Sequence, residues 1–176
     1  GVQTCDLPIF KFKSKQYLPD EFELALVVYE PSVVSLESAL ESHSMIPEAV
    51  YTTTCVTPRR AQEFETPFGL FKYYHVPEAR FYEGVRRSTT RTGVLLVAEP
   101  WRALADMMYT RHQAWDTLAD LEGDLRIDVP TLIEEYDQEL LETLSKQYPS
   151  ARVRKSLQRL LRQVVMYKKL SYSYAN

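Results

Sequence analysis

Four basic side chains near the C-terminal end of the sequence are spaced so that they would form one stripe along a helix. Arg152, Lys155, Arg159 and Arg162 follow one another at intervals of three, four and three residues. Such intervals place side chains on one helix face, and cations arranged in this way can neutralise nucleic acid phosphates. Two other interpretations stay open: a solvated helix face, or a stripe that pairs with an acidic segment of the same chain.

The charge is unevenly distributed along the sequence. The 176 residues carry a formal net charge of −3, whereas a dedicated nucleic-acid binder is usually basic. Residues 99–142 hold twelve acids and three basic residues, and residues 151–176 hold seven basic residues and no acid. This asymmetry predicts either electrostatic pairing inside the protein or a basic contact surface.

Two pairs of adjacent arginines provide secondary candidates for contact with a nucleic acid or an acidic partner. Arg59 and Arg60 follow one predicted strand, and Arg86 and Arg87 lie within another. Adjacent arginines more often face solvent than a ligand, so the final helix remains the first candidate for a working surface.

The sequence predicts no enzyme, no metal site and no cofactor. His43, His75 and His112 are scattered, and none has a cysteine or acid at a spacing typical of metal ligands. A nucleotidyltransferase would need a Gly-Ser turn ahead of its paired metal-binding aspartates. The chain contains no Gly-Ser dipeptide. It also contains neither a phosphate loop nor a Gly-x-Ser-x-Gly turn. We therefore assign no catalytic residue.

The composition is typical of a soluble globular protein. Hydrophobic residues make up 45% and charged residues 26% of the chain. No apolar run approaches the roughly 20 residues that a membrane span needs, so we expect a cytoplasmic protein without a membrane partner. Two cysteines, Cys5 and Cys55, are expected to be free thiols in a reducing compartment.

The order of the predicted elements indicates an α+β fold. It consists of a mostly antiparallel sheet of four to five strands in the middle of the chain, with helices mainly C-terminal. Residues 1–19 are expected to be irregular or an edge strand carrying Lys11, Lys13 and Lys15, and residues 20–176 form the domain. The strands are expected over about 49–57, 61–66, 70–76, 81–90 and 93–98, with a short one at 125–127. The helices are expected over about 21–29, 100–109, 113–121, 130–144 and 151–168, with one further helix capped by Ser32 or Ser35.

Several stretches of the middle region resemble a known family. The first is SLESAL at 35–40, followed by IPEAVY at 46–51 and TPRR at 57–60, and it is the order of these motifs that makes the match. Residues 64–75 match a hairpin pattern, and residues 95–109 match a strand-then-helix pattern. In this order they resemble the C-terminal domain of AbiEi-type antitoxins over about residues 31–110, with a weaker helical similarity to about 168. Trp101-Arg102 stands where the family pattern has Glu-Lys.

The resemblance implies a non-enzymatic antitoxin and transcriptional regulator of a bacterial type IV toxin–antitoxin system. Such a protein would support operator DNA binding and antagonise a nucleotidyltransferase toxin. Family members usually read DNA through an N-terminal winged helix-turn-helix, for which the 34 residues before Ser35 are too few. The chain is therefore expected to be the C-terminal part of a longer regulator or a short member, with a homodimer among its partners. The alternative is a stand-alone self-association domain without DNA binding.

Overall fold

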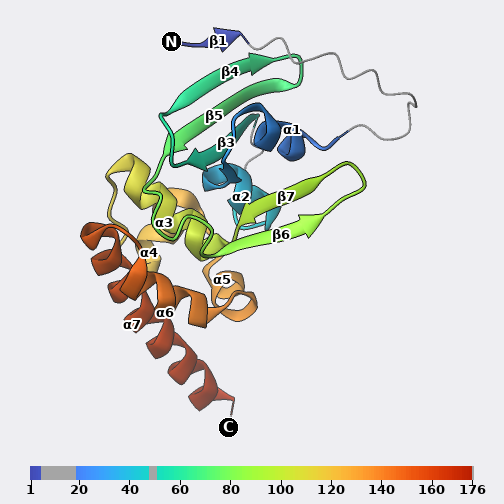
Figure 1. The fold of residues 1–176 in the computed structure, drawn as a ribbon. Helices are drawn as coiled ribbons and strands as arrows, with labels where there is room; N and C mark the ends of the chain where they lie inside the picture. Colours follow the sequence, from blue (N-terminus) through green and yellow to red (C-terminus); the bar gives the residue numbers. More distant parts are fainter. Residues whose placement is uncertain (5–18, 48–50, 176) are drawn as a thin grey trace.

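A computed structural model describes residues 1–4, 19–47 and 51–175 of the protein. Within these ranges one sheet of seven strands runs through the molecule in the order β1-β4-β5-β3-β2-β7-β6 (Figure 1). The strands are β1 (Gln3–Thr4), β2 (Val33–Val34), β3 (Thr52–Thr57), β4 (Gln62–Thr66), β5 (Gly69–His75), β6 (Val85–Thr89) and β7 (Val94–Ala98). The predicted α+β class is confirmed. The edge strand predicted at Lys11–Lys15 lies outside the described residues.

The sheet is mixed, so the prediction of a mostly antiparallel sheet with four or five strands is wrong. Three pairs of strands are antiparallel: β2 with β3, β4 with β5, and β6 with β7. Three others are parallel: β1 with β4, β2 with β7, and β3 with β5. The prediction assumed that each strand pairs with the next one in the chain, and the β3–β5 pair breaks that rule.

The β4–β5 hairpin lies with β5 inward because β5 carries the larger apolar side chains. Phe71 and Tyr73 alternate along β5 and are at most 1% exposed, whereas the side chains of β4 are half-buried or exposed. Burial of two aromatic rings favours an inner position for β5. Gly69, with φ of 117°, takes the left-handed turn conformation that joins the two strands, as its sequence context predicts.

Strand β2 joins the two halves of the sheet and was not predicted. Val33 and Val34 are fully buried, and β2 pairs with β3 on one side and β7 on the other. Two apolar residues between Pro31 and Ser35 carry no period from which a strand can be recognised.

Most of the helices follow the strands in the chain. They are α1 (Glu21–Val28), α2 (Leu36–Ser42), α3 (Pro100–Arg111), α4 (Leu118–Leu125), α5 (Val129–Glu135), α6 (Gln138–Gln147) and α7 (Ala151–Tyr174). The predicted caps Asp128 and Ser150 are confirmed, because each side chain accepts a backbone N–H of its helix. The strand predicted at 125–127 is wrong, since α4 continues to Leu125 and Arg126 caps it in the left-handed conformation. The helix predicted over 130–144 is two helices, α5 and α6.

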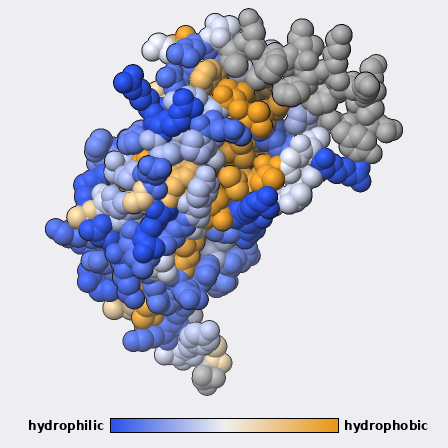
Figure 2. All heavy atoms as spheres, in the orientation of Figure 1, coloured by the Kyte–Doolittle hydropathy of each residue, from blue (hydrophilic) through white to orange (hydrophobic). Residues whose placement is uncertain are grey.

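The two faces of the sheet are covered unequally. Helices α2 and α3 pack on one face of the sheet. Helices α4 to α7 gather at the end of the molecule where α3 lies (Figure 1). The eight-residue α1 covers the other face. Because α1 is short, apolar side chains remain at the surface between α1 and β7 (Figure 2), around a groove of about 420 Å³ lined by residues that include Leu26, Val27, Val94 and Leu96.

Candidate functional site

Arg152, the first member of the predicted basic stripe, closes the C-terminal end of α3. Its guanidinium donates hydrogen bonds to the carbonyl oxygens of Met108 and Gln113, each at 2.8 Å. The last carbonyls of a helix have no partner within the helix, and a basic side chain can satisfy them. Arg152 therefore fastens α7 to α3.

Arg159 forms an ion pair with the acidic segment of the chain. Its Nη1 lies 2.8 Å from Oδ2 of Asp116, and the Ser156 hydroxyl donates to the other oxygen of the same carboxylate at 2.8 Å. The Ser156 hydrogen bond and the charge of Arg159 outweigh desolvation, so the pKa of Asp116 lies below its ordinary value. Pairing within the chain, one of the two open alternatives, thus accounts for Arg159.

The lowered pKa of Asp116 predicts a dependence of stability on pH. The carboxylate stabilises the fold above the pKa of an unfolded aspartate, about 3.9, and this contribution is lost as pH falls through the lower folded-state pKa. We expect Ser156→Ala to raise the pKa of Asp116 towards the unfolded value, measured by NMR titration of the carboxyl carbon. The melting temperature of the variant should then fall less steeply with acidification. Identical titration curves in the two proteins would contradict this role of Ser156.

Lys155 and Arg162 are the members of the stripe that remain available to a ligand. Both side chains are exposed on α7, and within the described part of the chain neither forms an ion pair. They lie seven residues apart, two helical turns, so they still share one face. The stripe therefore divides into two arginines that bind partners within the protein and two exposed cations without an ion pair among the described residues.

The secondary basic residues divide in the same way. The guanidinium of Arg59 lies 4.2 Å from the centre of the Tyr29 ring and donates to the carbonyl of Glu30, while Arg60 is exposed beside it. Arg86 pairs with Glu99 at 2.8 Å, and Arg87 is exposed on the edge strand β6. The exposed basic residues that form no ion pair among the described residues, Arg60, Arg87, Lys155 and Arg162, therefore lie on three separate elements: the β3–β4 connection, β6 and α7.

A buried polar network, which the sequence analysis did not anticipate, lies between the start of α2, α3 and the C-terminal end of α6. Arg102 and Asp106, one turn apart on α3, are 3% and 0% exposed. Nε of Arg102 donates to the Asp106 carboxylate at 2.9 Å. The same carboxylate accepts hydrogen bonds from the hydroxyls of Ser35 at 2.7 Å and Tyr148 at 2.8 Å. Buried charges are stable only when they are paired and hydrogen-bonded in this way.

The network also fixes the loop that precedes β6. Nη1 of Arg102 donates to the carbonyl oxygens of Phe81 and Glu83. Burial by itself lowers the pKa of Arg102, but the charge of Asp106 outweighs it and holds the pKa above its ordinary value. Burial and the Asp106 carboxylate raise the pKa of Tyr148 well above its usual range, so its hydroxyl stays a donor.

Ser35 has a different role from the predicted one. It occupies the N-cap position of α2, but its side chain accepts no hydrogen bond from that helix, and its hydroxyl instead donates to Asp106. The signal that could have revealed the network is the i, i+4 pair Arg102–Asp106 among Ala103, Leu104 and Met107, since charges within an apolar helix segment indicate a buried pair.

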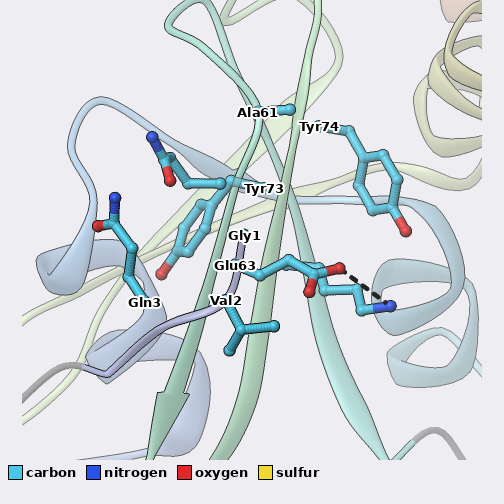
Figure 3. A pocket seen from close by; sticks show the side chains of 9 residues that line it. Gly1, Val2, Gln3, Ala61, Glu63, Tyr73 and Tyr74 are labelled. Atoms are coloured by element: carbon cyan, nitrogen blue, oxygen red, sulfur yellow. Dashed lines mark ion pairs between the residues drawn. The ribbon is translucent and has the colours of Figure 1, made fainter.

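A cavity of about 650 Å³ opens between β1 and the β4–β5 hairpin (Figure 3). Its lining includes Gln3, Tyr73 and Tyr74 together with the ion pair of Glu63 and Lys72, whose charged atoms are 3.3 Å apart. Glu63 and Lys72 neutralise each other in this ion pair. The cavity lining that the structure describes therefore offers no acid–base arrangement typical of a catalytic site.

The described residues form neither a metal-ligand cluster nor a membrane-spanning helix. In residues 1–4, 19–47 and 51–175, no three His, Cys, Asp or Glu side chains are grouped closely enough to hold a metal ion. None of the helices in the same ranges is long and apolar enough to cross a membrane. Cys55 is a buried free thiol whose pKa is raised by desolvation, and Cys5 lies outside the described residues.

Comparison with known proteins finds no protein-family model that matches the chain and no match among curated proteins.

Proposed function

We propose that this chain is the effector domain of an AbiEi-type antitoxin and transcriptional regulator, and that it acts by binding rather than by catalysis. In this proposal it antagonises a nucleotidyltransferase toxin and supports operator DNA binding, with sequence-specific reading by an N-terminal module. The proposal rests on the order of the sequence stretches that resemble this family.

The buried network is the structural observation that supports the resemblance best. Ser35 opens the SLESAL stretch, and Asp106 lies in the strand-then-helix stretch, 71 positions later. The Ser35 hydroxyl donates to Asp106 at 2.7 Å, and the Ser35 carbonyl accepts from Thr54 in β3 at 2.8 Å. Two separate stretches of the resemblance thus meet in one buried cluster, as parts of a common fold would, and Thr54 of β3, which lies between two further stretches, contacts the same serine. Arg102, which departs from the family pattern, supplies the counter-charge of that cluster.

The proposed working surface is the exposed part of the α7 stripe, Lys155 and Arg162. Replacing all four stripe residues would also remove the Arg152 contacts with α3, and a loss of binding could then arise from unfolding. A two-residue variant separates these effects, because both side chains are exposed and neither forms an ion pair within the described residues.

The antitoxin activity is tested by co-expression. We expect the full gene to restore growth of cells that express the neighbouring nucleotidyltransferase, and a frameshifted gene to serve as the control. Growth arrest despite soluble, folded regulator would overturn the antitoxin proposal.

The nucleic-acid surface is tested by fluorescence anisotropy of a labelled duplex from the upstream region of the gene. We expect binding that weakens with salt, and we expect Lys155→Ala/Arg162→Ala to reduce the slope of log K against log salt by about 2, about 1 per lost phosphate contact. Lys146→Ala, at an exposed lysine of α6, is the matched control. An unchanged slope would remove α7 from the DNA surface. Absence of binding at low salt would favour the alternative, a protein-interaction domain without DNA binding.

A further inference from the structure

The C-terminal end of α7 extends beyond the body of the protein. Val164 is the last buried residue of the helix, which continues to Tyr174 without a break. Figure 1 shows this end projecting past the other helices. We call residues 165–174 the tail; by the rise of an α-helix it is about 15 Å long.

The tail is apolar and basic at the same time. Met166 is 64%, Leu170 55% and Tyr174 91% exposed, and their spacing of four residues places them on one helix face. Lys168 and Lys169 lie between them, and the tail contains no acid. An exposed apolar stripe of this kind marks an interaction surface more often than a solvated one.

The complementary surface lies on the same protein. Residues 118–142, which form α4, α5 and the start of α6, contain nine acids and one arginine. We call the exposed acids of this region the acidic layer: Glu122, Asp124, Asp128, Glu134, Glu135, Asp137 and Glu139. Helix α7 packs on α6 and α4 as one unbroken helix, and its C-terminal end projects past them (Figure 1).

We propose that the tail of one copy docks on the acidic layer of a second copy, and that the exchange is mutual in a two-fold dimer. A two-fold arrangement uses the tail–layer contact twice, which increases the area that a short helix can bury. A second copy fits better than a nucleic acid, because phosphates would neutralise Lys168 and Lys169 but leave Met166 and Leu170 exposed. This association does not depend on the proposed antitoxin function.

The association is tested by sedimentation velocity at low and high salt. We expect a dimer at low salt that dissociates partly as salt rises. Two charge reversals, Lys168→Glu/Lys169→Glu in the tail and Glu134→Lys/Glu135→Lys in the layer, should each weaken dimerisation by roughly a hundredfold, because like charges then face each other in both contacts. Arg60→Glu/Arg87→Glu, a reversal of equal charge at exposed residues elsewhere, should leave the dimer intact.

A mixture of the two reversed variants separates docking from misfolding. In the mixed dimer the charge-reversed tail meets the charge-reversed positions 134 and 135, and the unchanged tail meets the unchanged ones, so opposite charges face each other in both contacts and dimerisation should be restored. Unfolded variants would not recover on mixing. A wild-type monomer at low salt, a failure of the mixture to associate, or binding of the tail to anionic phosphatidylserine vesicles by a monomeric protein would each overturn the proposal.

Discussion

Replacing Asp106 with asparagine is expected to lower the free energy of unfolding by about 3–5 kcal/mol, the usual cost of breaking a buried ion pair from one side. The side chain is completely buried and its carboxylate is the counter-charge of Arg102, which is 3% exposed. Asparagine keeps the volume of the side chain and removes its charge. The decrease in the free energy of unfolding therefore arises from the unpaired guanidinium of Arg102 and not from a cavity. Urea denaturation measures it as a lower midpoint at unchanged slope.

The matched control is the surface pair of Arg86 and Glu99, whose charged atoms are 2.8 Å apart, close to the 2.9 Å of the buried pair. The Arg86 side chain is 59% exposed, and solvent screens such pairs, so Arg86→Ala should cost less than about 1 kcal/mol. If the two substitutions cost the same, the Arg102–Asp106 pair is not buried as described.

A double-mutant cycle tests whether the pair acts as a unit. We expect Arg102→Met/Asp106→Leu to destabilise the protein by less than the sum of the two single changes, because the double variant leaves no unpaired charge. The Ser35 and Tyr148 hydroxyls and the carbonyls of Phe81 and Glu83 still lose their partner, so full recovery is not expected.

Local signals in the sequence predict individual elements well. Alternating and β-branched residues indicate β3, β5 and β7 to within a few residues, and Asp128 and Ser150 indicate two helix starts. Each of these signals depends on residues that are neighbours in the chain. The parallel pairing of β3 with β5 depends instead on which strand of the β4–β5 hairpin lies inward. That position is set by the burial of Phe71 and Tyr73 of β5 in the assembled sheet, not by neighbours in the chain.

In the candidate site, too, the sequence predicts features that depend on neighbouring residues and does not predict partners that are distant in the chain. Helical spacing predicts that the four stripe residues share a face of α7, but spacing says nothing about neighbours. The partners of Arg152 are carbonyls of α3 and its C-terminal end, about forty positions earlier, and the partner of Arg159 is Asp116. The excess of acids in 99–142 predicts pairing in general, and only the fold decides that it uses Asp116.

Gly84 is the second position where a single small change should have a large effect. Its φ is 72°, a left-handed conformation that costs other residues roughly 1–2 kcal/mol. A Cβ at this position would lie 2.9 Å from Cβ of Arg102 and 3.1 Å from Cδ1 of Leu140. Since the first of these atoms is fixed to the backbone of α3, the loop itself must shift, which adds roughly 1–3 kcal/mol of overpacking.

We therefore expect Gly84→Ala to destabilise the protein by about 2–5 kcal/mol in urea denaturation. Gly123→Ala is the matched control, because Gly123 lies in α4 with nothing within 4 Å of an added Cβ. Alanine is the better helix former, so this change should stabilise by about 0.5–1 kcal/mol. The opposite signs follow from backbone conformation and space alone. Equal stability of the two variants would contradict both the left-handed conformation of Gly84 and its close approach to Cβ of Arg102.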